Sequence, residues 1–161
     1  MSGDRASGYV TEIEYTGGFY PELGPVRLGF AAQAAGLGGP DPGLPFTYLE
    51  LGCGQGRSTA LHAASLPHGR FFAADLNPAH IRNARALSES AGLANVTWLE
   101  RSFAELLDED LPDLDFITLQ GVYSWISAEN RRHVAELVRR RLKPGGLVYL
   151  SYNALPGWTA A

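Results

Sequence analysis

The 161-residue sequence predicts an α/β fold built on a doubly wound, mostly parallel sheet. Three observations lead to this fold class. Short apolar runs alternate with segments of helical spacing from Phe46 onward. Turns rich in Gly and Pro separate these segments, and no internal repeat or low-complexity tract interrupts the alternation. Strands that alternate with helices form βα units, which assemble into a parallel sheet with helices on both faces.

Each expected element has its own signal. Pro25 begins a helix that ends before Gly36, because proline suits the first helical turn and glycine the position after the last. Bulky apolar residues predict the strands, which we place at 46–51, 70–75, 95–100, 113–120 and 147–152. Helical spacing predicts the helices between them, which we place at 58–66, 77–90, 127–142 and, as a short one, from Ser102 onward.

Three of these helices also have N-cap signals. Asn77 precedes a proline, which is the order of a cap and a first helical residue. Ser102 and Glu105 have the spacing of a capping box. Ser127 precedes the longest helix, which the sequence Lys-Pro-Gly-Gly ends.

Composition excludes several classes of protein. With 45% hydrophobic and 19% charged residues, the chain is not disordered, collagen-like or coiled-coil. A net charge of −4 argues against a nucleic-acid partner, and the Arg-rich stretch 131–143 is better explained as a solvated helix face. The sequence has no long apolar run, no secretory signal at its start and a single cysteine. We therefore expect a cytoplasmic protein without a membrane partner.

The strongest local signal is the run Glu50–Gly56, where the first strand turns into a helix. Glycines there permit tight turns and let a ligand approach backbone N–H groups. Asp75 ends the second strand, 19 residues after Gly56, where a carboxylate accepts hydrogen bonds from ribose hydroxyls. The spacing is G-x-G-x-G rather than the G-x-G-x-x-G of dinucleotide sites. The Glu50 carboxylate is a poor neighbour for a diphosphate but suits an ammonium and a sulfonium.

This Glu-x-Gly-x-Gly-x-Gly pattern resembles the first motif of the class I S-adenosylmethionine-dependent methyltransferases, whose sheet is Rossmann-like. The resemblance implies S-adenosylmethionine as cofactor, with Asp75 on the ribose hydroxyls and Leu76 beside the adenine. Ser102 replaces the family's Asp at the adenine amine, so it either contacts the cofactor or caps the helix. Phe103 packs either on the adenine or in the core. The implied cofactor-binding residues are Glu50, Gly52, Cys53, Gly54, Gly56, Asp75, Leu76, Ser102, Phe103 and Gln120.

Three further stretches are more specific: GFYPELGPVRL, LQGVYSWIS and LVYLSYNALPGW. Together they resemble a bacterial methyltransferase family that carries a regulatory domain after the catalytic core and includes protein-lysine methyltransferases. The resemblance implies a methyl acceptor, in this family a protein lysine. We expect two regions, an N-terminal aromatic segment and helix at 1–45 that covers the cofactor site, and a methyltransferase core at 46–161.

The class I sheet has seven strands, whereas five are predicted here. We therefore expect that the chain is part of a longer protein and that the core is truncated after the fifth strand. Strand 147–152 would then be an apolar edge without charge or proline. Such an edge either self-associates or pairs with the N-terminal segment.

Aromatic residues are predicted near the carboxyl ends of two strands, the edge where open α/β sheets bind ligands. Aromatic rings can line a channel for a lysine and stack on a cation. The substrate-binding candidates are Tyr20, Tyr123, Trp125, Tyr152 and Asn153.

No pattern predicts a catalytic residue or a metal site. Cys53 has no His at a suggestive spacing, so we expect it to be a small apolar filler. The histidines at 62, 68, 80 and 133 lack the spacing of metal ligands. Methyl transfer needs no covalent catalyst, since the cofactor supplies the activated methyl group. Two alternatives remain: a small-molecule methyltransferase of the same fold, and a cofactor-binding interaction module without activity.

Overall fold

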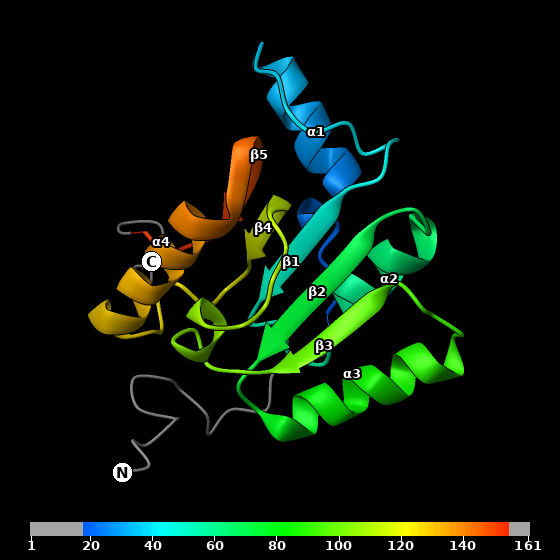
Figure 1. Cartoon of the computed structure of the whole chain (residues 1–161), viewed down its shortest axis with the longest axis vertical. Coiled ribbons are helices and arrows are strands. Elements are labelled where there is room, and N and C mark those ends of the chain that lie inside the picture. Colours follow the sequence, from blue (N-terminus) through cyan, green and yellow to red (C-terminus); the bar gives the residue numbers. More distant parts are fainter. Residues whose placement is uncertain (1–17, 155–161) are drawn as a thin grey trace, which may run out of the picture.

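Five parallel strands form one sheet in the order β3-β2-β1-β4-β5 (Figure 1). The computed structural model describes residues 18–154. The strands are β1 (Thr47–Leu51), β2 (Arg70–Asp75), β3 (Val96–Glu100), β4 (Leu114–Leu119) and β5 (Leu142–Leu150). This order confirms the predicted doubly wound sheet, because strands are added on one side from β1 to β3 and on the other side from β4 to β5.

The helices lie close to their predicted positions. They are α1 (Pro25–Ala34), α2 (Arg57–Ser65), α3 (Pro78–Ser90) and α4 (Ala128–Arg141), with 3₁₀ turns at Pro21–Leu23 and Glu105–Leu107. The predicted caps are present. The Asn77 side chain accepts a hydrogen bond from the Ala79 N–H at 2.9 Å, and Ser127 accepts one from the Asn130 N–H at 3.2 Å. Capping signals in the sequence therefore located these helix starts to within a residue or two.

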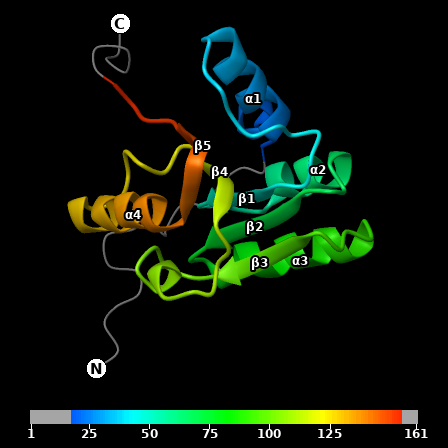
Figure 2. The same cartoon turned by 45° about the horizontal axis from the view of Figure 1, so that its top comes forward.

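Helices cover both faces of the sheet, as Figure 2 shows. Successive residues of a strand point to opposite faces. Tyr48 packs on the face of α2 with Phe71 and Phe116, whereas Leu49 and Leu51 pack on the other face in a cluster that includes Leu137 of α4. A strand that is apolar on both faces is typical of a buried parallel sheet.

Strand β5 differs from its prediction at both ends. It begins at Leu142, directly after α4, and ends at Leu150, so Tyr152 lies beyond it. Its register against β4 shifts between the pair Leu114–Leu142 and the pair Phe116–Leu147. The Lys-Pro-Gly-Gly sequence causes this irregularity, because Gly145 adopts a φ of 79° and interrupts regular pairing.

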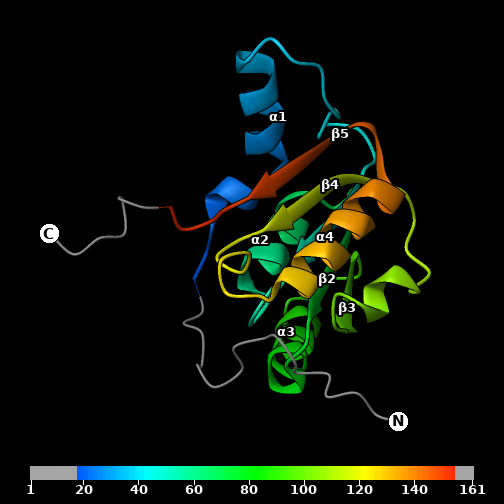
Figure 3. The ribbon, with the colours of Figure 1, turned by 90° about the vertical axis from the view of Figure 1, so that its left-hand side faces the viewer.

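Strand β5 forms one edge of the sheet, and within residues 18–154 no strand pairs with its outer side (Figure 3). Of the N-terminal region, the described part from residue 18 onward lies beside β5 as helix α1 and not as a strand. Leu28 of α1 and Leu147 of β5 pack against the same core cluster, and Gly39 approaches Leu147. Self-association through this edge stays a prediction.

Helix α1 rises from the end of the sheet where β1 and β2 begin, away from the carboxyl ends of the strands (Figure 1). The stretch before it, Gly18–Tyr20, contacts α2 instead. The Tyr20 N–H donates to the Ser58 hydroxyl at 3.0 Å, and the Phe19 ring lies 5.3 Å from the His62 ring. Coverage of the cofactor site by residues 1–45 stays a prediction, and residues 1–17 lie outside the described residues.

None of the helices in the described part of the chain has the length and apolar character needed to cross a membrane.

Candidate functional site

The glycine run forms the turn between β1 and α2 at the carboxyl edge of the sheet. The N–H groups of Gly52 and Cys53 both donate to the carbonyl of Ala74, at 2.8 and 3.1 Å, which joins the loop to the end of β2. Gly52, Gly54 and Gly56 have φ values of 71°, 52° and 73°. All three lie in the left-handed region that favours glycine, so the loop needs this residue type at each position.

The surroundings of the three glycines differ. A Cβ on Gly52 would lie 2.6 Å from Val122, and one on Gly56 would lie 2.6 Å from both Ala84 and Trp98. A Cβ on Gly54 would meet nothing within 4 Å. Packing therefore explains the glycines at 52 and 56. At Gly54 the open side of the loop leaves room for a ligand to approach the backbone.

The carboxylate of Asp75 lies beside this open loop and joins it to α3. Its Oδ2 accepts the Gly54 N–H at 2.9 Å, and its Oδ1 accepts the Asn77 N–H at 2.8 Å. The Nδ1 of His80 lies 3.2 Å from Oδ1. A carboxylate oxygen has about two acceptor positions, so Oδ2 keeps one free for a ligand hydroxyl. A second hydroxyl would have to share Oδ2 or displace one of these donors.

Glu50 is a buried acid at the end of β1, with only 3% of its surface exposed. Its carboxylate accepts a hydrogen bond from the Thr59 hydroxyl of α2. Burial raises the pKa of Glu50 to about 7, while the bond from Thr59 lowers it and the nearby Asp75 raises it. A cationic group placed beside Glu50 would favour its ionised form.

Cys53 is buried in the loop, and its Sγ contacts the carbonyl of Gly54 at 3.7 Å. Burial raises the pKa of the thiol well above its ordinary value, with Glu50 adding to the shift. A thiol is a weak nucleophile unless it ionises. The structure therefore agrees with the prediction of an apolar filler rather than a nucleophile.

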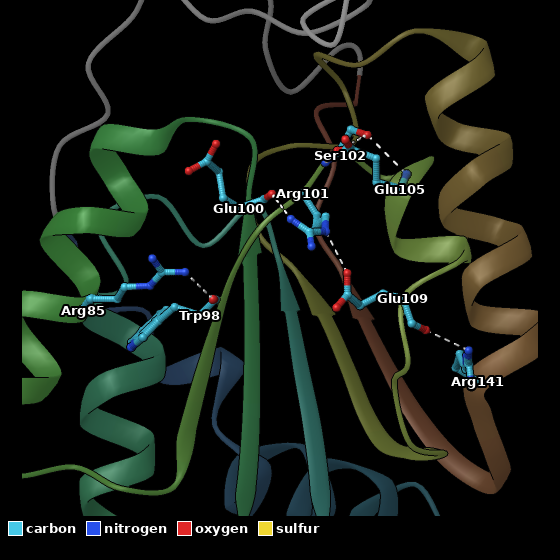
Figure 4. A network of polar contacts seen from close by, with 8 residues as sticks. All are labelled: Arg85, Trp98, Glu100, Arg101, Ser102, Glu105, Glu109 and Arg141. Atoms are coloured by element: carbon cyan, nitrogen blue, oxygen red, sulfur yellow. Dashed lines mark hydrogen bonds and ion pairs between the residues drawn. The ribbon is translucent and has the colours of Figure 1, made fainter.

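Two predicted cofactor residues follow β3, and both make contacts within the fold. The N–H and hydroxyl of Ser102 donate to Glu105 Oε2 at 2.7 and 2.9 Å (Figure 4). In return, the Glu105 N–H donates to the Ser102 hydroxyl oxygen at 3.2 Å. This reciprocal set is the predicted capping box. Phe103 is buried in the core cluster on the α4 face. The capping and core roles are thus visible, while cofactor contact by either residue stays a prediction.

The same loop is held in place by an ion pair and by hydrogen bonds to backbone carbonyls. Arg101 pairs with Glu109 at 2.7 Å, and Arg141 of α4 donates to the carbonyl of Glu109 at 2.9 Å (Figure 4). Arg141 also donates to the carbonyl of Leu111 at 2.6 Å. Arg141 belongs to the Arg-rich stretch at 131–143, so part of that positive charge serves internal contacts.

Gln120 follows β4 at the carboxyl edge, and its side-chain Oε1 is buried without a hydrogen-bond partner among the described residues. A buried acceptor without a donor is unfavourable by ~1–3 kcal/mol, so this atom fits a site that receives a donor from a ligand. Leu76 follows Asp75 and is half-buried. Cofactor contact by Gln120 and Leu76 stays a prediction.

Four of the five predicted substrate residues, all except Tyr20, lie on two loops that hydrogen bonds join. The Gly121 N–H donates to the Ser151 hydroxyl at 2.7 Å, and the Asn153 N–H donates to the Ser124 hydroxyl at 2.7 Å. Trp125 is 51% exposed and Tyr152 is 66% exposed. These loops therefore present aromatic surface at one edge of the sheet.

Tyr123 and Tyr20 are less exposed than those rings. Tyr123 packs under the Arg131 guanidinium, 5.2 Å from its ring, and lines an apolar cavity of about 220 Å³ between α4 and β5. Tyr20 is fixed on α2 through its backbone.

Sequence reasoning missed two residues of the site. Thr59 lies in the first turn of α2 and contacts Glu50, and His80 lies in the first turn of α3 and contacts Asp75. The histidines have neither the spacing of metal ligands nor that of a partner for Cys53, and neither pattern indicates a contact with Asp75. A His five residues after the acid, in the first turn of a capped helix, was the available clue. Within residues 18–154 no cluster of three or more His, Cys, Asp or Glu could hold a metal.

Comparison with known proteins places the chain in a family. The model of the methyltransferase domain family matches residues 49–146. This chain belongs to the methyltransferase domain family. It is a class I methyltransferase domain, and S-adenosylmethionine is the cofactor of this family.

Similar proteins include an uncharacterised protein and two that carry methyltransferase names or a bound cofactor product. An uncharacterised protein of Synechocystis sp. is 49% identical over 154 residues, which cover 96% of this chain and 30% of that protein. The structure of PKMT2 from Rickettsia typhi in complex with AdoHcy has a TM-score of 0.83 and 30% identity, and the match covers 89% of this chain and 27% of that one. A malonyl-[acyl-carrier protein] O-methyltransferase of Anoxybacillus flavithermus is 29% identical over 110 residues, 68% of this chain and 40% of that enzyme. The chain thus spans less than a third of the first two relatives.

Proposed function

We propose that this methyltransferase domain binds S-adenosylmethionine at the carboxyl end of β1 and serves methyl transfer to a protein lysine. One observation carries the cofactor site. The open side of Gly54 lies next to the Asp75 carboxylate, which keeps an acceptor position free on Oδ2. A backbone without a side chain beside an oriented carboxylate suits a nucleoside with its ribose hydroxyls.

Two further groups support the choice of a cationic cofactor. Glu50 is a buried carboxyl next to the loop, and a positive ligand group would stabilise its ionised form. The buried Oε1 of Gln120 lacks a donor among the described residues, and an N–H of the ligand would satisfy it. NAD would instead place its anionic diphosphate at the glycine loop, beside the Glu50 carboxylate.

The proposal of a lysine acceptor rests on the similarity to PKMT2 and on the aromatic side chains at the carboxyl edge of the sheet. PKMT2 of Rickettsia typhi is 30% identical to this chain, and the match covers 89% of this chain. The exposed rings of Trp125 and Tyr152 supply aromatic surface at the same sheet edge. When bound, the cofactor supplies the activated methyl group. The rings of this chain would orient the lysine, exclude water and favour its neutral, nucleophilic form, because burial lowers the pKa of an amine.

Calorimetry with S-adenosylhomocysteine tests the cofactor site. We expect binding by the wild-type chain and no binding of NAD. Asp75→Ala should weaken S-adenosylhomocysteine binding by about 2–4 kcal/mol, because one partner of a charge-assisted hydrogen bond is lost. Asp110→Ala, at an exposed site, is the matched control. Stabilisation by NAD alone would refute the proposal.

A transfer assay tests the acceptor. A cell lysate incubated with the protein and isotopically labelled S-adenosylmethionine is digested and analysed by mass spectrometry. Labelled methyl-lysine in peptides supports a protein acceptor. Label found only in small molecules would favour a small-molecule methyltransferase, and binding without any transfer would favour an interaction module.

A further inference from the structure

Helix α3 contacts the cofactor loop along one face. His80, Asn83 and Ala84 lie three and four residues apart, so their side chains share one side of the helix. The Asn83 amide donates to Gln55 at 2.8 Å, and Ala84 fills the space beside Gly56. His80 contacts Asp75, which in turn accepts the Gly54 N–H. The loop thus rests on α3 at successive points.

Within this face, the contact between His80 and Asp75 is enclosed. The His80 side chain is 6% exposed and that of Asp75 is 14% exposed, with Nδ1 and Oδ1 3.2 Å apart. An ionised carboxylate only accepts hydrogen bonds, so Nδ1 carries the proton in this contact. Asn77 caps α3 and directs its own N–H to the same oxygen at 2.8 Å. The N-terminus of α3 also favours a negative charge at this position.

The two carboxylate oxygens of Asp75 have different hydrogen-bond partners. Oδ1 accepts two hydrogen bonds from the start of α3, whereas Oδ2 accepts one from Gly54 and faces the open loop. A carboxylate attached through one rotatable bond could otherwise turn and exchange its oxygens. Anchoring Oδ1 therefore keeps Oδ2 directed to the loop.

We propose that His80 is a positioning residue for the cofactor, which holds Oδ1 of Asp75 so that Oδ2 is presented to the ribose hydroxyls. The inference rests on the proposed function, because it assumes that Asp75 binds the ribose. It assigns to His80 a role in orientation and not in the transfer step.

A double-mutant cycle with S-adenosylhomocysteine as the probe tests this role by calorimetry. We expect His80→Leu to weaken binding about tenfold, because the loss of one hydrogen bond to a charged group is worth ~1.5 kcal/mol. In the Asp75→Ala background the same change should alter binding less than twofold. His80→Asn should retain binding within about threefold, since its amide can donate from the position of Nδ1, whereas His80→Gln, which donates from the position of Nε2, should not.

The outcomes separate this inference from the proposed function. Unchanged binding in Asp75→Ala would overturn the cofactor site itself. If Asp75→Ala weakens binding and His80→Leu does not, the cofactor site is supported and the positioning role of His80 is refuted. Equal losses from His80→Leu with and without Asp75 would mean a merely structural effect and would also overturn the inference. Thermal denaturation shows which variants are folded. If His80→Leu does not fold, the comparison of binding by His80→Asn and His80→Gln tests the positioning role instead.

Discussion

Replacing Glu50 by Gln should stabilise the free domain at alkaline pH and weaken cofactor binding at the same time. The side chain is 3% exposed and has Thr59 as its hydrogen-bond donor. Gln has nearly the same shape, and its amide oxygen can still accept from Thr59. The substitution therefore removes a buried charge while it preserves the packing.

The size of the expected gain in unfolding free energy follows from the raised pKa of Glu50. Burial raises this pKa from the ordinary 4.5 to about 7, so the folded state binds the proton more tightly than the unfolded state. The stabilisation is complete below about pH 4.5 and is lost as pH rises through 7. A shift of this size corresponds to about 3 kcal/mol, since each pKa unit is ~1.4 kcal/mol. Glu50→Gln does not titrate, so above pH 7 it should be more stable than the wild type by up to that amount.

Urea and thermal denaturation at pH 5 and pH 8 measure the effect. At pH 8 the variant should melt roughly 6–12 °C above the wild type, and at pH 5 the difference should fall to about a quarter of that. S-Adenosylhomocysteine should bind the variant at least tenfold more weakly at pH 8. Glu89→Gln, an exposed substitution on α3, controls for the loss of a carboxylate. Equal or lower stability of Glu50→Gln at pH 8 would refute the argument from burial.

Three further predictions concern the loop and the turn after β3. Gly56→Ala should destabilise the domain by roughly 2–5 kcal/mol in urea denaturation and Gly54→Ala by roughly 1–2 kcal/mol, because both positions are left-handed but only the first is crowded. Gly54→Ala should instead weaken S-adenosylhomocysteine binding in calorimetry, and the reverse ranking would contradict the assignment of the open side. Ser102→Ala should lower stability by about 1 kcal/mol through loss of the capping box while affinity changes less than twofold; a larger loss of affinity would restore a cofactor role to Ser102. Cys53 should react with a thiol reagent at pH 8 only after unfolding, and rapid reaction of the native chain would show that the thiol is neither buried nor raised in pKa.

Local patterns in the sequence determined most of the fold. Alternation of apolar runs with helical spacing is a property of neighbouring residues, so the strands and helices from residue 46 onward could be placed from it. Capping by Asn77 and Ser127 is also local, and both helix starts were predicted correctly. The glycine spacing and an acid at Asp75 indicated the cofactor class, because a turn that needs left-handed glycines is encoded within a few residues.

The tertiary structure alone decided how those residues interact. Folding brings Val122 against Gly52 and Trp98 against Gly56, although these residues are far apart in the sequence. These contacts distinguish Gly52 and Gly56, where packing leaves no room for a Cβ, from Gly54, which is open. Likewise, Glu50 acquires its raised pKa from burial, and Asp75 accepts the Gly54 N–H because β2 lies beside β1 in the sheet. Burial, close approach and shared hydrogen bonds depend on segments distant in the chain, and a sequence pattern that acts over a few residues does not contain them.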